Sequence, residues 1–151
     1  MKKILYVDMD NVLVDFKSGI AKLDESLIKE YENRLDEVPG IFGLMEPMKD
    51  AIESYKELAK HFDTYLLSTS PWENETAGSD KLKWVKKHLG KVTYKRLILS
   101  HHKNLNTGDY LIDDRLKNGV DEFTGEHIHF GTEQFPDWLI VKEYLLKKVN
   151  L

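Results

Sequence analysis

The sequence contains no cysteine, and only four prolines and nine glycines occur among its 151 residues. Without cysteine, a disulfide framework, a thiol nucleophile and a cysteine-based zinc finger are excluded. Long apolar runs are also missing, because only residues 4–7 separate the N-terminal lysines from Asp8. A signal peptide needs about 7–15 apolar residues and a spanning helix about 20. The sequence therefore predicts a soluble, cytoplasmic protein with no membrane contact.

Positive charge is scarce: 22 Lys and Arg stand against 26 Asp and Glu, and the net charge is −4. Nucleic-acid polymers are bound by basic faces, so they are not expected as partners, although one local basic group can hold a small polyanion. Hydrophobic residues make up 41% and charged residues 32%, which is typical of a folded domain. This length predicts one domain, residues 1–151.

Short apolar runs typical of buried strands recur along the chain. They lie at residues 4–7, 64–67, 97–99, 110–112 and 127–130. Helical spacing of apolar residues separates them, with helices expected near Pro47, from Ser79 to Gly90, and after Pro136. Strands that alternate with helices predict an α/β fold with a doubly wound, Rossmann-like parallel sheet.

Residues 17–45 do not fit this simple alternation. Their apolar residues recur at steps of three and four, which predicts an amphipathic helix, in one piece or two, that Pro39 and Gly40 end. Because the segment follows the first strand and precedes another helical pattern, we interpret it as a small helical cap inserted over the edge of the sheet. The alternative is that it forms the first crossover helix.

Polar residues follow four of the predicted strands. They are Asp8 and Asp10, Ser68-Thr69-Ser70, Ser100 to Lys103, and Asp113-Asp114-Arg115. In an open parallel sheet the ligand crevice lies outside the carboxyl ends of the strands, so these groups are expected to share one rim. Carboxylates without a nearby cysteine favour Mg²⁺ over zinc.

This set of residue types fits phosphoryl transfer. Asp8 is a candidate nucleophile and Asp10 a candidate acid and base, while Thr69, Ser70 and Lys103 are candidates to hold phosphate oxygens. A carboxylate that approaches a phosphate meets like-charge repulsion of about 4 kcal/mol per charge pair at 4 Å and an effective dielectric of 20. A bound Mg²⁺ and the lysine ammonium would offset that repulsion.

These residues resemble the four motifs of haloacid dehalogenase-like (HAD) phosphatases. Within that superfamily, the chain is most similar to the 5'(3')-deoxyribonucleotidase branch, over residues 4 to about 115. The matching stretches are DMDNVLVDF (8–16), PGIF (39–42), EP (46–47), STSP (68–71), KWV (83–85) and LIDDR (111–115). The resemblance implies a HAD-like sheet with a small cap and dephosphorylation of deoxyribonucleoside 5'(3')-monophosphates through an aspartyl-phosphate.

The resemblance also implies roles for the acidic residues. Asp8 would be the nucleophile and Asp10 the acid and base. Mg²⁺ would be bound by the Asp8 carboxylate, the backbone carbonyl of Asp10 and Asp114. Asp113 would support the site from behind, or would exchange roles with Asp114.

By the same resemblance, Thr69, Ser70 and Lys103 would hold the phosphate, and Phe16 would stack on a nucleobase with Phe42 nearby.

Two features of the sequence depart from the pattern of the family. Asn11 replaces the usual glycine of the first motif, and the 61 positions from Asp8 to Thr69 leave room for only a short cap.

Two other functions compete with this one: hydrolysis of another small phosphoester, such as a sugar phosphate, and a phospho-accepting receiver-like signalling module. A receiver carries its acceptor aspartate after the third strand, where this chain has His101-His102-Lys103.

The lysines at 81, 83, 86 and 87 are interpreted as a solvated helix face. No zinc site is expected from the histidines at 101–102 or 127 and 129, since adjacent histidines rarely converge on one ion.

Overall fold

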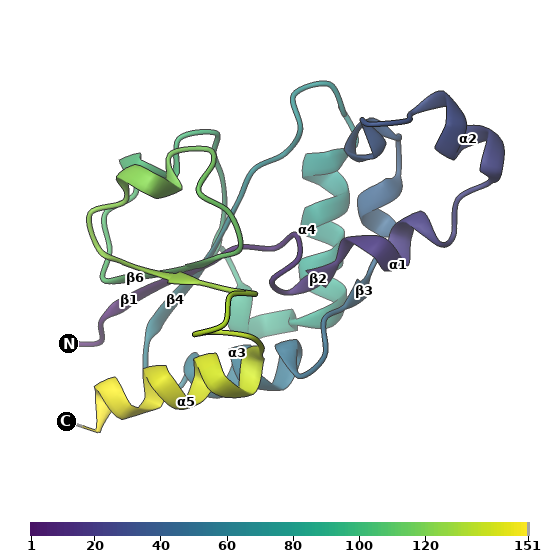
Figure 1. Ribbon diagram of the computed structural model, residues 1–151. Coiled ribbons are helices and arrows are strands. Elements are labelled where there is room, and N and C mark those ends of the chain that lie inside the picture. Colours follow the sequence, from purple (N-terminus) through teal and green to yellow (C-terminus); the bar gives the residue numbers. More distant parts are fainter. Residues whose placement is uncertain (151) are drawn as a thin grey trace.

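Five strands form one parallel sheet at the centre of the computed structural model, which describes residues 1–150 (Figure 1). The spatial order is β5-β4-β1-β6-β7. The strands are β1 (Ile4–Val7), β4 (Asp63–Ser68), β5 (Leu97–Leu99), β6 (Tyr110–Asp113) and β7 (Glu126–His129). Each apolar run lies within a residue or two of a strand, and the predicted α/β fold with a parallel sheet is confirmed.

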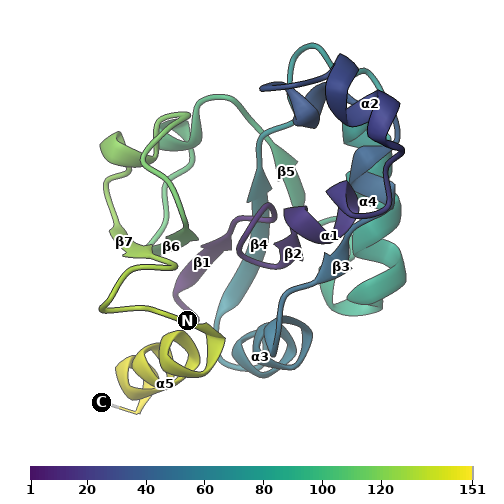
Figure 2. The same ribbon diagram turned by 45° about the vertical axis from the view of Figure 1, so that its right-hand side comes forward.

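Three longer helices follow the pattern predicted from apolar spacing: α3 (Ala51–Leu58), α4 (Ala77–His88) and α5 (Trp138–Val149). Helices α3 and α5 lie side by side below the sheet in Figure 2. Leu5, Val7 and Ile112 belong to the same buried cluster as these helices. Residues on alternate positions of the strands, such as Tyr6 and Leu111, form a smaller cluster on the other face of the sheet. That cluster is completed by residues in and beside a 3-10 turn, η5 (Val120–Glu122).

Two helix starts differ from those expected. Pro47 lies in the short strand β3 (Glu46–Pro47), and α3 begins only at Ala51. Helix α4 begins at Ala77 with Thr76 at its N-cap, so Ser79 lies inside its first turn. The predicted end of α4 and the predicted start of α5 agree with the structure. Gly90 follows α4 with a φ of 66°, and α5 begins after Asp137, whose carboxylate accepts a hydrogen bond from the Ile140 amide at 3.0 Å.

The predicted amphipathic helix over 17–45 consists of four short pieces. They are α1 (Phe16–Ile20), α2 (Glu25–Glu30), η1 (Leu35–Glu37) and η2 (Ile41–Gly43). Left-handed backbone at Asn33 and Gly40, with φ of 66° and 84°, breaks the helical path. Close packing also keeps the pieces separate, since a Cβ on Gly19 would come within 2.7 Å of the Met45 side chain. We call residues 16–43 the helical segment.

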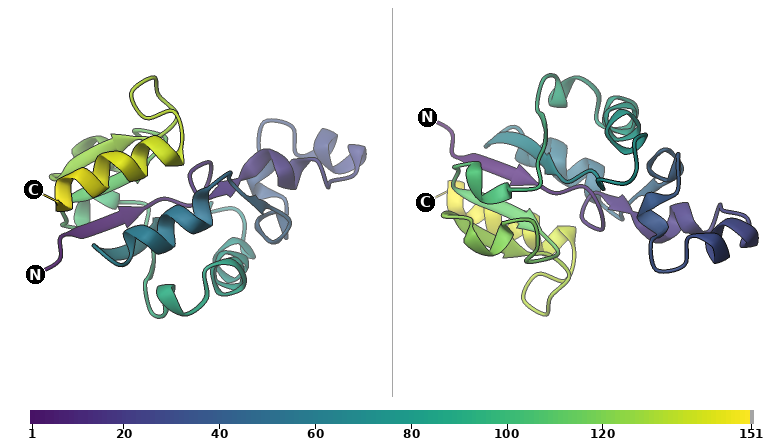
Figure 3. Two further views of the ribbon diagram at one scale, coloured as in Figure 1. Left: turned by 90° about the horizontal axis from the view of Figure 1, so that it is seen from below. Right: turned by 90° about the horizontal axis from the view of Figure 1, so that it is seen from above.

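The helical segment is joined to the rest of the molecule by a small antiparallel ribbon. Strand β2 (Val14–Asp15) pairs with β3, with Val14 opposite Pro47 and Asp15 opposite Glu46. Both views of Figure 3 show the helical segment extending beyond the sheet at the end opposite the two termini. The chain then crosses from β1 to β4 through α3, so the alternative in which residues 17–45 form that crossover is wrong.

Among residues 1–150, none of the helices is both long enough and apolar enough to cross a bilayer.

Candidate active site

The chain makes a tight turn directly after β1, and this turn carries the first acidic pair. The Asp8 amide donates to the Ile112 carbonyl at 2.9 Å, which ties the turn to the neighbouring strand β6. Asn11 has a φ of 60°, and its side-chain oxygen accepts a hydrogen bond from the Phe16 amide at 3.3 Å. Asparagine tolerates this left-handed conformation better than most residues, so it can stand where the family has glycine.

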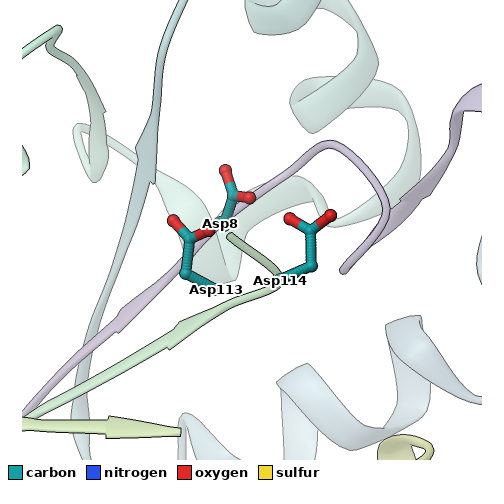
Figure 4. A group of neighbouring side chains, drawn as sticks. All are labelled: Asp8, Asp113 and Asp114. Carbon is teal, nitrogen blue, oxygen red and sulfur yellow. The ribbon is translucent and has the colours of Figure 1, made fainter. Parts of the chain in front are cut away.

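Three carboxylates from β1 and β6 converge at the carboxyl ends of these strands. Asp8, Asp113 and Asp114 each offer an oxygen within 4.8 Å of the others (Figure 4). Lys103 lies under them with 3% of its surface exposed, and its ammonium donates to Asp8 Oδ1 at 3.0 Å and to Asp113 Oδ2 at 2.6 Å. The shared rim predicted from the sequence is therefore present for these four residues.

One ammonium does not balance three carboxylates, of which Asp8 and Asp113 are buried and Asp114 is half-buried, and the pKa values reflect this. Burial, together with the charge of Asp8, raises the pKa of Asp113 to about 6 and that of Asp114 to about 7. Burial on its own would lower the pKa of Lys103, but attraction to Asp8 and Asp113 outweighs burial and raises it. The cluster keeps an excess of negative charge that a bound cation would neutralise.

The donors of the cluster fit Mg²⁺, a hard cation that takes oxygen ligands. Both oxygens of Asp113 are already engaged, Oδ2 by Lys103 and Oδ1 by the Arg115 amide at 2.9 Å. Asp114 Oδ1 is buried and has no hydrogen-bond partner within residues 1–150. Of the second acidic pair, Asp114 is therefore the residue with an oxygen free for a metal.

A pocket of about 530 Å³ opens above this cluster. Asp10, Thr69 and Asp114 line it at the strand ends. The helical segment contributes Phe16, and Trp72, 83% exposed, contributes to the wall after the β4 strand. The pocket thus combines carboxylates with apolar and aromatic walls, which is typical of a site for a small molecule.

Residues 25–135 match the protein family described as 5' nucleotidase, deoxy (pyrimidine), cytosolic type C protein. The chain belongs to this nucleotidase family. It is 62% identical, over 144 residues, to a Vibrio phage KVP40 protein named "Putative 5'(3')-deoxyribonucleotidase". That match covers 95% of this chain and 85% of the phage protein. A Staphylococcus aureus protein with the same name is 28% identical, covering 99% of this chain and 98% of the relative.

Solved structures agree on the fold of this nucleotidase. A haloacid dehalogenase-like hydrolase from Streptococcus pneumoniae matches with a TM-score of 0.55 at 12% identity, covering 95% of this chain and 98% of that one. A similar hydrolase from Xanthomonas campestris matches with a TM-score of 0.57 at 9% identity, covering 99% and 96%. The resemblance to HAD-like phosphatases and to their deoxyribonucleotidase branch is confirmed.

Of the three residues predicted to hold phosphate, Thr69 lines the pocket, whereas Ser70 and Lys103 are not among its lining residues. The Thr69 hydroxyl donates to the Ser100 carbonyl at 2.7 Å. Ser70 Oγ is buried and has no partner within the described residues. Lys103 has two N–H groups on carboxylates, which leaves a third for a phosphate oxygen.

The two predicted aromatic residues differ in exposure. Phe16 lines the pocket, whereas Phe42 is 2% exposed and lies behind it. The rings meet edge to face, with centroids 6.0 Å apart and an interplanar angle of 71°. Phe42 therefore does not reach the pocket itself but supports Phe16, which does.

One lysine of the predicted lysine face, Lys81, is buried. The prediction of a solvated lysine face is correct for Lys83, Lys86 and Lys87, which are exposed, and wrong for Lys81. Lys81 donates to Asp10 Oδ2 at 3.1 Å and is 1% exposed. Its spacing was a usable signal, because position 81 falls on the same helix face as the buried residues 77, 84 and 85.

The two histidines of β7 each contact a backbone carbonyl of the second acidic pair. His127 Nε2 lies 2.9 Å from the Asp113 carbonyl, and His129 Nε2 lies 3.0 Å from the Asp114 carbonyl. Their rings stack with centroids 4.9 Å apart. Alternate residues of a strand point to one side, so this pair braces the backbone of the second acidic pair from the neighbouring strand.

Proposed function

We propose that this nucleotidase hydrolyses deoxyribonucleoside 5'(3')-monophosphates in a Mg²⁺-dependent reaction that passes through an aspartyl-phosphate on Asp8. The observation that carries the proposal is the position of Asp8. It lies at the end of a central strand, paired with the Lys103 ammonium at 3.0 Å and clustered with Asp113 and Asp114. A carboxylate at this place, paired with an ammonium, is a competent nucleophile toward phosphorus.

The cation would be held by the carboxylates of Asp8 and Asp114 and by the backbone carbonyl of Asp10. Asp113 would support it from behind, because its two oxygens are engaged by Lys103 and Arg115. When bound, Mg²⁺ supplies positive charge that lets a phosphate dianion approach the carboxylates. Thr69, Ser70 and the remaining N–H of Lys103 would hold phosphate oxygens.

The chain's own groups account for the proton transfers. Asp8 attacks phosphorus and the ester oxygen leaves, taking a proton from Asp10. Burial raises the pKa of Asp10, while the Lys81 ammonium limits that rise. A raised pKa favours the protonated form that a general acid needs. Asp10, now ionised, then removes a proton from the water that attacks the aspartyl-phosphate, and phosphate is released with Asp8 regenerated.

Substrate choice would depend on the helical segment, which acts in this proposal as the cap predicted for residues 17–45. Phe16 offers a face for a nucleobase, and Phe42 holds its ring in place from behind. The short segment is equally compatible with another small phosphoester, such as a sugar phosphate. Because nucleoside monophosphates are metabolites of the cytoplasm, we propose that the protein acts there. We also propose that residues 1–151 act as a single domain.

The test is phosphate release, with and without Mg²⁺, from a panel of 5'- and 3'-deoxyribonucleotides, ribonucleotides, sugar phosphates and an aryl phosphate. Asp8→Asn is the control, because it preserves the shape of the side chain but removes the nucleophile. A preference for deoxyribonucleotides that is lost in Asp8→Asn supports the proposal. Activity confined to sugar or aryl phosphates refutes the nucleotide assignment, and full activity of Asp8→Asn refutes the mechanism.

A further inference from the structure

Lys81 is a buried cation at the edge of the proposed active site, and every one of its polar contacts is made there. Its ammonium donates to Asp10 Oδ2 at 3.1 Å, Ser68 Oγ at 2.7 Å and the Thr69 carbonyl at 2.8 Å. The ring of Phe42 covers it, with the centroid 4.6 Å from Nζ. Burial of an ammonium is unfavourable unless it is paired and hydrogen-bonded, so this arrangement demands an explanation.

The polar partners of Lys81 come from two parts of the chain, at the ends of the paired strands β1 and β4. Asp10 is in the turn after β1, Ser68 ends β4, and Thr69 begins the loop proposed to hold phosphate. Lys81 itself is on α4. The side chain therefore fixes the turn that carries Asp10 relative to the loop that would carry the phosphate.

The two oxygens of Asp10 are in different situations. Oδ2 accepts the hydrogen bond from Lys81, whereas Oδ1 is buried and has no partner within residues 1–150. Asp10 lines the pocket. A carboxyl held by one oxygen can rotate little, so the Asp10 carboxyl is kept at a fixed place at the edge of the pocket.

We propose that Lys81 is a positioning residue that holds the Asp10 carboxyl at the edge of the pocket, where it serves the oxygen of the leaving group. This inference rests on the proposed function, because it assumes that Asp10 acts as the general acid. It assigns the two buried lysines separate tasks: Lys103 holds Asp8 and Asp113, and Lys81 holds Asp10.

The proposal makes the effect of Lys81 depend on the leaving group. A deoxyribonucleoside leaves as a basic alkoxide that needs a proton, whereas 4-nitrophenolate leaves readily without one. Loss of correct Asp10 placement should therefore slow nucleotide hydrolysis far more than hydrolysis of 4-nitrophenyl phosphate. A lysine with a merely structural role would affect both esters alike.

The experiment compares kcat/KM for a deoxyribonucleoside monophosphate and for 4-nitrophenyl phosphate, since this parameter reports the steps up to cleavage of the ester bond. The variants are Lys81→Met, Lys81→Arg and the matched control Lys83→Met, which alters an exposed lysine on the same helix. Lys81→Met should lose about tenfold or more on the nucleotide relative to the aryl ester, which is part of the roughly 10²–10⁴-fold that a general acid usually contributes, because Asp10 itself remains. Lys81→Arg should restore part of that ratio, and Lys83→Met should leave it unchanged.

A second comparison asks whether Lys81 acts through Asp10. In an Asp10→Asn background the acid is already lost, so adding Lys81→Met should cost little more on the nucleotide. Equal losses on both esters, or a full further loss in the Asp10→Asn background, overturn the proposal. If Lys81→Met does not fold, Lys81→Gln is read by the same two criteria. Failure of the proposed function is distinguishable, because it would appear in the wild-type protein as absence of nucleotide hydrolysis.

Discussion

Acidification from pH 8 to pH 6 should weaken Mg²⁺ binding, because the cation and a proton compete for Asp114. Burial and the neighbouring Asp8 raise the pKa of Asp114 to about 7. About nine-tenths of Asp114 is then ionised at pH 8 and about one-tenth at pH 6, which lowers the apparent affinity about tenfold. That ratio corresponds to about 1.4 kcal/mol of binding free energy.

Isothermal titration calorimetry at pH 6, 7 and 8 measures this directly, and buffers with different ionisation enthalpies report the proton released. Asp114→Asn is the control, since it removes the titrating group and should bind weakly at every pH. The same shift in the pKa of Asp114 also determines how the stability of the folded state depends on pH. A carboxyl whose pKa is raised in the folded state stabilises the fold at low pH, and that contribution is lost as the pH rises from about 4 through about 7. The rise in Tm caused by Mg²⁺ should therefore grow over this window. Dissociation constants within twofold at pH 6 and pH 8 would refute the reasoning.

Three substitutions test other parts of the structure. Phe16→Ala should raise KM for deoxyribonucleotides about fivefold or more through lost stacking, with a smaller effect on 4-nitrophenyl phosphate; equal effects in steady-state assays would contradict base stacking. Lys103→Met leaves Asp8 and Asp113 buried without their cation, so urea unfolding without Mg²⁺ at pH 7 should show a loss of about 3–5 kcal/mol, and a loss below about 1 kcal/mol would contradict the pairing. Asn11→Ala should cost about 1 kcal/mol in the same assay and Asn11→Gly much less, because Asn11 has a left-handed backbone; the reverse order would contradict that conformation.

The sheet and its rim of acidic residues were predictable because their signals are local. Each buried strand is an apolar run, and the topology of a parallel sheet brings the residues that follow these runs to one edge. Asp8 and Asp113 illustrate this: they are far apart in the chain, yet both follow runs on adjacent strands. The order of strand-end residues was enough to predict which of them would meet.

The helical segment and Lys81 depend on packing that a periodic pattern does not contain. Apolar steps of three and four predict an amphipathic helix in one piece or two, but left-handed residues such as Asn33 and close contacts at Gly19 divide the segment further. Lysine is rarely buried, so Lys81 was grouped with its exposed neighbours. Its burial depends on Asp10 and Phe42, which come from two other regions of the chain and meet it only after folding.

The β2–β3 ribbon holds the two ends of the helical segment next to each other. Val14 pairs with Pro47 and Asp15 with Glu46, so the chain leaves and re-enters the sheet domain through neighbouring strands, about 4.8 Å apart. Insertions are tolerated where the two ends of a segment lie close together. Residues can thus be added to or removed from the segment between these pairs without altering the register of β1 and β4. A longer segment inserted between these pairs would change the walls above the pocket, but it would have to keep Phe42, which covers the ammonium that holds Asp10.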